Sequence, residues 1–258
     1  MLNIKDIQQF YPPILHGKTR HILREYIQCE ILSYLFSHKF ANKICFIGGT
    51  SLRLIYNNSR FSEDLDFDNF DLKKEEFEIM MEDLKKHLEK NGYEIEMRVL
   101  YKGAYHCNIK IPSILYQNNI TNMKTEKILI KIDTFGQGYN FVPDKKQLNR
   151  FNFDFYCNVA SVNLLLAHKI NTLFDRYKGR DLFDISFLLN LTQTPDYGYL
   201  QAKQGIKDSI KLKNSILEKI KDYDFEQLQK DVEPFIFRDE DKRVLHFKET
   251  IEQTKFEE

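Results

Sequence analysis

The chain contains 258 residues, of which 42% are hydrophobic and 29% are charged, and its 38 Lys and Arg residues balance 38 Asp and Glu residues. This composition is typical of a globular protein of one or two domains and excludes collagen-like, Gly-rich and largely disordered chains. The charge is nevertheless uneven. Residues 62–83 contain ten acidic side chains against two lysines, whereas residues 16–60 contain seven basic and two acidic ones, which indicates oppositely charged surfaces.

The cysteines and the N-terminal residues bear on the compartment. Cys29, Cys45, Cys107 and Cys157 form neither a Cys-x-x-Cys pair nor a zinc-binding spacing, so we expect free thiols, those of Cys45 and Cys107 buried, in a reducing compartment. The first residues lack the apolar stretch of a signal peptide, and no apolar run approaches 18 residues. We therefore expect a cytoplasmic protein that has no membrane partner.

The first part of the chain alternates between helical and extended patterns. Residues 20–38 place apolar side chains at helical spacing, which predicts an amphipathic helix. Residues 43–47 form a short apolar strand that ends at a Gly-Gly pair, and Thr50 is the predicted N-cap of a helix reaching about residue 56. After an Asn-Asn-Ser turn, residues 64–68 alternate acidic and apolar side chains, which predicts a strand with one acidic face.

The remaining elements predict the fold class. A charged helix is expected over residues 73–91, and three strands follow it, the last two joined by a polar connection; these strands are residues 93–100, 104–111 and 127–135. From about Val159 onward the apolar period is helical almost throughout. The sequence therefore predicts an α+β core in residues 1–150 and a helical domain in residues 151–258.

Two aspartates lie two positions apart on one predicted strand. Asp64 and Asp66 therefore project from one face, where their charges repel unless a cation lies between them. Mg²⁺ suits this arrangement because it binds carboxylates together with substrate phosphates. Asp133 lies on the strand of residues 127–135; if the two strands are neighbours, three carboxylates converge, as metal-dependent phosphoryl or nucleotidyl transfer requires. Taken alone, an Asp-x-Asp pair is more typical of solvated or helix-capping acids; the third strand aspartate and the upstream glycines favour the metal site.

The Gly48-Gly49 pair allows two interpretations. A tight turn that needs positive φ is one. Close approach of the backbone to a triphosphate is the other, with amides and the Thr50 or Ser51 hydroxyl as donors. The pair matches neither a Walker loop nor Gly-x-Gly-x-x-Gly.

Three motifs in chain order carry a family resemblance. The first is GGTSLRLIYNNSRFSEDLDF at residues 48–67, the second is Lys131-Ile-Asp133, and the third combines LAHKI at 166–170 with RYKGRDLFD at 176–184. Together they resemble the motifs of the AbiEii/AbiGii toxin family, which belongs to the DNA polymerase beta-like nucleotidyltransferase superfamily.

The resemblance implies a nucleotidyltransferase-like mixed sheet flanked by helices, and a C-terminal helical domain that completes the nucleotide site. It also implies transfer of NMP from an NTP with two Mg²⁺ ions, for which Mn²⁺ could substitute. Asp64 and Asp66 would hold both ions, Asp133 would hold the catalytic ion or deprotonate the attacking hydroxyl, and Lys169 would neutralise the triphosphate. The further nucleotide-binding residues would be Gly48, Gly49, Thr50, Ser51, Arg60, Ser62, Lys131, Arg176, Arg180, Asp181 and Asp184.

The third motif also has a helical geometry of its own. If residues 166–184 formed one helix, Lys169, Arg176 and Arg180 would lie on one polar stripe with Asp184 close to it. Ion pairs along the helix, such as Arg180 with Asp184, are the structural alternative.

Three regularly spaced lysines bear on the acceptor of the transferred nucleotide. Lys203, Lys207 and Lys211 are spaced four residues apart, which predicts one basic helix face that could follow an RNA backbone. A solvated helix face is the alternative. The family resemblance implies an RNA acceptor such as tRNA and a cognate antitoxin partner.

Three other functions compete with this interpretation. A glycosyltransferase could use an Asp-x-Asp pair with Mn²⁺, but it needs neither the third carboxylate nor the upstream glycines. A non-catalytic nucleotidyltransferase-like domain could bind RNA or protein, although all three aspartates are present. A nucleotidyltransferase acting on a small molecule such as an antibiotic, or on a protein, would use the same residues.

Overall fold

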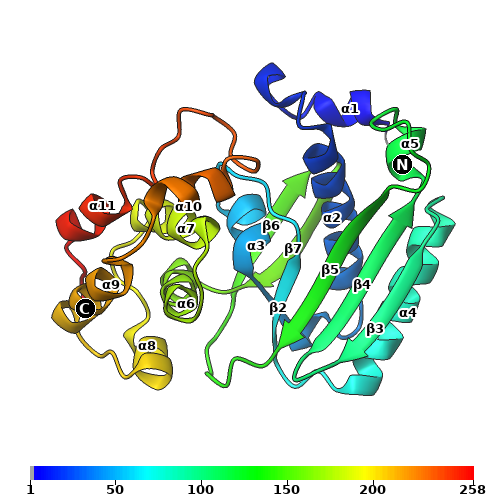
Figure 1. Cartoon of the computed structure of the whole chain (residues 1–258). Coiled ribbons are helices and arrows are strands. Elements are labelled where there is room, and N and C mark those ends of the chain that lie inside the picture. Colours follow the sequence, from blue (N-terminus) through cyan, green and yellow to red (C-terminus); the bar gives the residue numbers. More distant parts are fainter. Residues whose placement is uncertain (1–2) are drawn as a thin grey trace. The chain divides into compact units, whose positions relative to one another are not determined.

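The computed structural model describes residues 3–258, which contain eleven α-helices, two short 3-10 helices and one seven-stranded sheet (Figure 1). The chain folds as two compact units. The first unit is formed by residues up to Tyr56, Phe61–Gly138 and Pro143–Val159. The second unit is formed by Asn57–Arg60, Tyr139–Val142 and Ala160–Glu258.

The first unit contains the sheet, in the order β3-β4-β5-β2-β1-β7-β6. Its strands are β1 Ile44–Ile47, β2 Leu65–Asn69, β3 Glu96–Tyr101, β4 Tyr105–Pro112, β5 Lys127–Phe135, β6 Asp144–Arg150 and β7 Phe153–Val159. Strand β2 is parallel to β5 and β1 is parallel to β7, while the other neighbours are antiparallel. The expected mixed sheet is therefore confirmed.

Five α-helices accompany the sheet in this unit. They are α1 Ile4–Gln8, α2 Thr19–Ser37, α3 Gly48–Ile55, α4 Lys74–Lys90 and α5 Ile114–Gln117, with 3-10 turns at Pro13–Leu15 and Ala41–Lys43. Alternation on β5 distinguishes the two faces of the sheet: Ile128, Ile130 and Ile132 are buried, whereas Lys131 and Asp133 remain partly exposed. Helices α2 and α4 pack together and lie against the apolar face (Figure 1).

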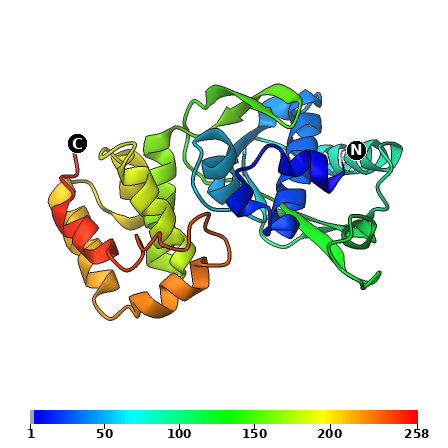
Figure 2. The same ribbon diagram turned by 90° about the horizontal axis from the view of Figure 1, so that it is seen from above.

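The second unit is helical. Its helices are α6 Val162–Asp175, α7 Gly179–Leu189, α8 Tyr197–Gln204, α9 Ser209–Ile220, α10 Phe225–Val232 and α11 Phe247–Gln253. Helix α7 packs against α6, α10 and α11, and Figure 2 shows the helices of this unit, coloured yellow-green to red, grouped together. Side-chain caps begin several of them; Ser161, for example, accepts a hydrogen bond from the Leu164 amide at the start of α6.

Most predicted elements are confirmed, but two strands were missed, and the expected division near residue 150 and the expected N-cap need correction. Strands β6 and β7 were not predicted. Strand β6 has the polar sequence DKKQLNR and buries only Leu148, so it shows no apolar alternation. Since β7 pairs with β1, the first unit extends to Val159, beyond the division expected near residue 150. Thr50 is not an N-cap: helix α3 already begins at Gly48, and Thr50 lies within its first turn.

The thiols and the membrane prediction can be checked directly. All four cysteines are buried and free, and burial raises the pKa of each thiol, to about 12 for Cys107 and Cys157. In the part of the chain from Asn3 to Glu258, no helix is long and apolar enough to cross a membrane.

Candidate functional site

Two of the three predicted aspartates are direct neighbours in the sheet. Strands β2 and β5 run parallel with Asp66 opposite Asp133, and both side chains are half-buried. Directly paired residues project from the same face, so the two carboxylates share the face opposite α2 and α4. Asp64 immediately precedes β2, and continuing the β2–β5 register by one residue places it beside Lys131. The strand adjacency on which the convergence of the carboxylates depended is therefore present.

A histidine extends the same row. His106 on β4 is paired with Asp133, and its Nδ1 lies 2.7 Å from Asp133 Oδ1. An ionised carboxylate only accepts hydrogen bonds, so His106 Nδ1 is the donor. Sequence analysis did not identify His106. The sequence predicted the strand of residues 104–111 that contains it, but it could not predict that His106 is paired with Asp133.

The glycine turn lies against the first of these carboxylates. Gly48 has φ +76°, and a Cβ added to it would lie 2.2 Å from Asp66 Oδ2. Only glycine fits this position, because any side chain would be both strained and in collision with Asp66. Of the two interpretations of the Gly-Gly pair, the positive-φ turn is therefore present, and its backbone also closely approaches a site carboxylate.

The hydroxyls next to the turn bind backbone. Thr50 Oγ1 donates to the Asp64 carbonyl at 2.5 Å, and Ser51 Oγ donates to the Gly48 carbonyl at 2.9 Å. Ser62 is half-buried two residues before Asp64, and its carbonyl accepts a bond from Gln28 of α2. These bonds fix the backbone on both sides of Asp64.

A buried ion-pair network anchors α3. Glu25 of α2 binds Arg53 of α3 at 2.9 and 3.1 Å, Arg150 of β6 at 2.7 Å and the Tyr11 hydroxyl at 2.8 Å. Burial opposes ionisation of Glu25, but the two guanidinium groups hold its pKa below the ordinary value. Arg53 belongs to the first family motif, and here it fixes the helix that carries the glycine turn.

The donor set suits a hard divalent cation. Asp66 and Asp133 offer only oxygen atoms, and Mg²⁺ is commonly held by one or two carboxylates while substrate phosphates and water complete its coordination. Among residues 3–258, no three His, Cys, Asp or Glu side chains are gathered into a preformed metal cluster. The two carboxylates themselves, as oxygen-only donors, fit a hard divalent cation.

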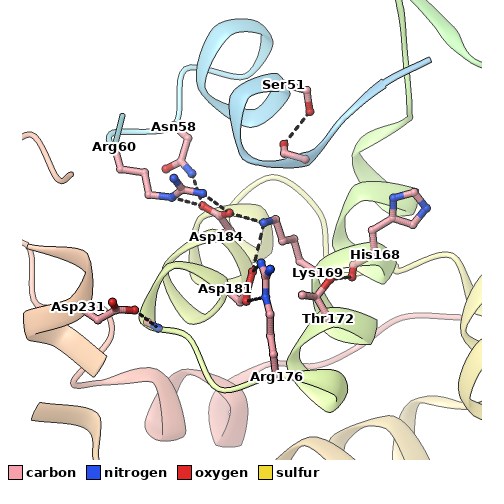
Figure 3. A network of polar contacts seen from close by, with 12 residues as sticks. Ser51, Asn58, Arg60, His168, Lys169, Thr172, Arg176, Asp181, Asp184 and Asp231 are labelled. Carbon is pink, nitrogen blue, oxygen red and sulfur yellow. Dashed lines mark hydrogen bonds and ion pairs between the residues drawn. The ribbon is translucent and has the colours of Figure 1, made fainter. Parts of the chain in front are cut away.

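The second unit gathers residues of the third motif around a buried aspartate. Asp184 accepts bonds from Arg60 at 2.6 and 2.7 Å and from Asn58 at 2.8 Å, and its other contact is Lys169 Nζ at 2.8 Å (Figure 3). Burial would raise the pKa of Asp184, but Arg60 and Lys169 lower it to about 2. Sequence analysis did not identify Asn58, since the Asn-Asn-Ser segment reads as a simple turn.

Asp181 continues this network. It accepts from Arg176 at 2.7 and 2.9 Å and lies 3.3 Å from Lys169 Nζ (Figure 3). Despite complete burial of Asp181, Lys169 and Arg176 hold its pKa below the ordinary value. Lys169 thus forms ion pairs with two buried carboxylates of its own unit.

The expected single helical stripe is wrong. Helix α6 ends at Asp175, Arg176 is extended, and α7 begins at Gly179. The two helices bring the charged residues together by packing, and the Arg180 guanidinium lies 4.8 Å from the Phe235 ring centroid. The alternative ladder is not the arrangement found either, because Arg60 and Lys169 are the ion-pair partners of Asp184.

The expected basic helix face is also wrong. Helix α8 ends at Gln204, Gly205 turns the chain with φ +65°, and α9 begins only at Ser209. Lys203, Lys207 and Lys211 therefore lie on a helix, a loop and a second helix. Lys211 Nζ donates to the Gly205 carbonyl at 2.7 Å, so part of this charge serves the turn itself.

A mixed sheet that pairs two aspartates on neighbouring strands, with a glycine turn against one of them, defines a nucleotidyltransferase-like protein. The chain belongs to the AbiEii nucleotidyl transferase toxin family of type IV toxin–antitoxin systems, whose family model matches residues 30–249. This membership implies an NTP substrate and an antitoxin partner, and nucleotidyltransferases generally use a divalent metal ion.

Solved structures share the fold. MenT4, a nucleotidyltransferase toxin from Mycobacterium tuberculosis, is 15% identical with a TM-score of 0.58, and the match covers 99% of this chain and 91% of that one. JHP933 from Helicobacter pylori is 17% identical over 90% of both chains, with a TM-score of 0.56. A putative nucleotidyltransferase from H. pylori is 18% identical over 90% and 92% of the chains, with a TM-score of 0.56. No curated protein sequence matches the chain.

Proposed function

We propose that this toxin transfers NMP from an NTP to an RNA acceptor, with Asp64, Asp66 and Asp133 holding two Mg²⁺ ions. The observation that carries the proposal is the direct pairing of Asp66 with Asp133 on parallel strands. Two half-buried carboxylates side by side are costly unless cations compensate them. Bound ions would neutralise the triphosphate and polarise the α-phosphate.

The transfer step itself assigns roles to Asp133 and to the glycine turn. The acceptor hydroxyl oxygen bonds to the α-phosphorus, the bond between the α-phosphorus and the bridging oxygen breaks, and pyrophosphate leaves. Asp133 would hold the catalytic ion or take the proton of the attacking hydroxyl. Gly48 and Gly49 bring backbone close to the phosphates without side-chain obstruction.

Lys169 and its neighbours keep their proposed part in nucleotide binding. Lys169 Nζ lies 2.8 Å from Asp184 and 3.3 Å from Asp181, and the two aspartates also bind Arg60 and Arg176. Such a gathering of lysine and arginine side chains suits an anionic ligand such as a phosphate. Lys169→Ala should therefore weaken NTP binding in a fluorescence or calorimetric titration, whereas unchanged affinity would leave Lys169 with a structural role alone.

The proposed acceptor is RNA, with tRNA as the first candidate. The sheet face that carries Asp133 also carries Arg98 of β3, Lys110 of β4 and Lys131 of β5. Arg98 and Lys131 flank Asn108 in one row across the strands, and Lys110 lies in the next row of the same face. These three cations form no ion pair with the described residues, and Arg98 and Lys110 are exposed. Unpaired cations beside the carboxylates suit a phosphate backbone, whose binding should weaken with salt. A small-molecule or protein acceptor is the alternative.

The test is incubation of the toxin with each labelled NTP, Mg²⁺ and total RNA, followed by gel electrophoresis. Label should enter a tRNA-sized band, and Asp66→Asn should reduce it at least ~100-fold because several kcal/mol of charge stabilisation are lost. Asp154→Asn is the matched control: this strand aspartate accepts a bond from Gln147 and lies on β7. Full activity of Asp66→Asn, or in excess chelator, would contradict the metal mechanism.

The acceptor surface is tested separately by charge reversal. Arg98→Glu with Lys110→Glu should weaken RNA labelling strongly at low salt, while Lys203→Glu with Lys207→Glu should leave it nearly unchanged. If the Lys203 and Lys207 variant lost labelling and the Arg98 and Lys110 variant kept it, the RNA-binding surface would lie on the second unit. Label in a small molecule or protein, and none in RNA, would refute the RNA acceptor. Expression without the antitoxin should inhibit growth, and Asp66→Asn should relieve the inhibition.

A further inference from the structure

We infer that His106 is a positioning residue that fixes the Asp133 carboxylate for its part in the transfer reaction; the inference rests on the proposed function. His106 and Asp133 are directly paired on β4 and β5, and His106 Nδ1 donates to Asp133 Oδ1 over 2.7 Å. About a third of each side chain is exposed, so the pair faces the open side of the sheet rather than the core.

The bond divides the two oxygens of Asp133 between two tasks. Oδ1 is held by the histidine, whereas Oδ2 has no hydrogen-bond or ion-pair partner among the residues that the structure describes. A terminal carboxylate torsion is broad and roughly two-fold, so without His106 the group would rotate and present either oxygen. The histidine therefore leaves one defined oxygen for a metal ion or for the acceptor hydroxyl.

The arrangement places the three side chains in a fixed order across the sheet. Asp66 lies opposite Asp133 on one side and His106 lies opposite Asp133 on the other. Ligating carboxylates in metal sites are usually held by such outer hydrogen bonds, and loss of one costs about 10–100-fold in metal affinity or activity. Backbone pairing of β2, β5 and β4 sets the order Asp66, Asp133, His106 across the sheet. We therefore expect substitution of one side chain to leave the other two in place.

Three variants of His106 distinguish the contribution of its hydrogen bond to Asp133 from that of the imidazole ring. His106→Ala removes the donor, His106→Asn places an amide NH₂ where Nδ1 lies, and His106→Gln places its amide farther along, near the position of Nε2. Asn108→Ala is the matched control, since Asn108 is half-buried on the same face of β4 but is paired with Lys131. Each variant is checked by its melting temperature.

Two measurements are made on each variant: Mn²⁺ binding in the absence of NTP, followed by the Mn²⁺ electron paramagnetic resonance signal, and the kcat and KM of transfer. His106→Ala should weaken Mn²⁺ binding or lower kcat about 10–100-fold. Its values should therefore approach those of the Asp133→Asn variant. His106→Asn should restore most of the loss, His106→Gln should not, and Asn108→Ala should behave as wild type.

The outcomes separate the inference from the proposed function. Wild-type protein that binds Mn²⁺ in an Asp133-dependent way but transfers no nucleotide would refute the proposed function, while the Mn²⁺ series would still test His106. Normal Mn²⁺ binding and normal kcat in His106→Ala would overturn the inference. Normal Mn²⁺ binding with equally low kcat in His106→Ala and His106→Asn would also overturn it, because the ring itself would then be the proton acceptor.

Discussion

At the scale of single residues, the site is defined by close approach. The backbone of Gly48 packs directly against the Asp66 carboxylate. Its positive φ allows α3 to begin immediately after β1. Asp66 in turn is paired with Asp133, which His106 holds. The geometry of the carboxylates therefore depends on a residue that has no side chain.

Gly48→Ala should destabilise the protein by about 1–3 kcal/mol through backbone strain, and by more where the new Cβ displaces Asp66. Chemical denaturation measures the loss. Gly103→Ala is the control, since Gly103 has φ +70° and no heavy atom within 4 Å of an added Cβ. The difference between the two variants reports the collision alone, and equal losses would show that Asp66 simply moves aside.

At the scale of elements, the short break between α6 and α7 decides how the third motif works. Three residues separate the helices, and Arg176 turns back to bind Asp181 at the start of α7. Asp184 binds two cations from different segments, Arg60 before β2 and Lys169 on α6. The buried charges therefore hold together segments that are distant in sequence.

Asp184→Ala should cost about 3–5 kcal/mol of unfolding free energy, because it leaves Arg60 and Lys169 buried without their shared partner. Lys169→Met should cost less, since Arg60 still pairs with Asp184 and Arg176 still pairs with Asp181. Urea denaturation of both variants measures the order. A larger loss for Lys169→Met would show that the lysine is the structural centre of the network.

At the scale of the whole molecule, each of the two units contains a histidine kept neutral by burial. His21 stacks on Phe61 in the first unit and His168 contacts Tyr199 in the second. Burial lowers the pKa of each to about 4, with Arg24 adding to the effect at His21. In the unfolded chain these histidines would titrate near pH 6.5.

Stability should therefore fall as the pH decreases from 6.5 to 4, because in that window the unfolded state binds protons that the folded state does not. For His168 the loss is on the order of 3 kcal/mol across the window. His168→Phe, which keeps a ring against Tyr199, should flatten the dependence of the unfolding free energy on pH. The exposed His246→Gln is the control. An unchanged pH dependence in His168→Phe would contradict a neutral, buried His168.

The sequence by itself determined the elements and the motifs. Apolar period predicted α2, α4 and the helical character of the second unit, and alternation predicted β2 and β5, because burial of one face leaves a local pattern. The same local signals gave the Asp-x-Asp pair and the glycine turn. The family resemblance drawn from these motifs was confirmed by the match over residues 30–249.

Only the tertiary structure decided the contacts between elements. The register that pairs Asp66 with Asp133 and Asp133 with His106 depends on long-range strand pairing, which no local pattern encodes. The polar edge strand β6 was invisible because it buries a single side chain. Helical spacing also failed at Lys203, Lys207 and Lys211 and between Lys169 and Asp184, because periodicity assumes an unbroken helix, whereas breaks at Gly205 and Arg176 redirect the chain.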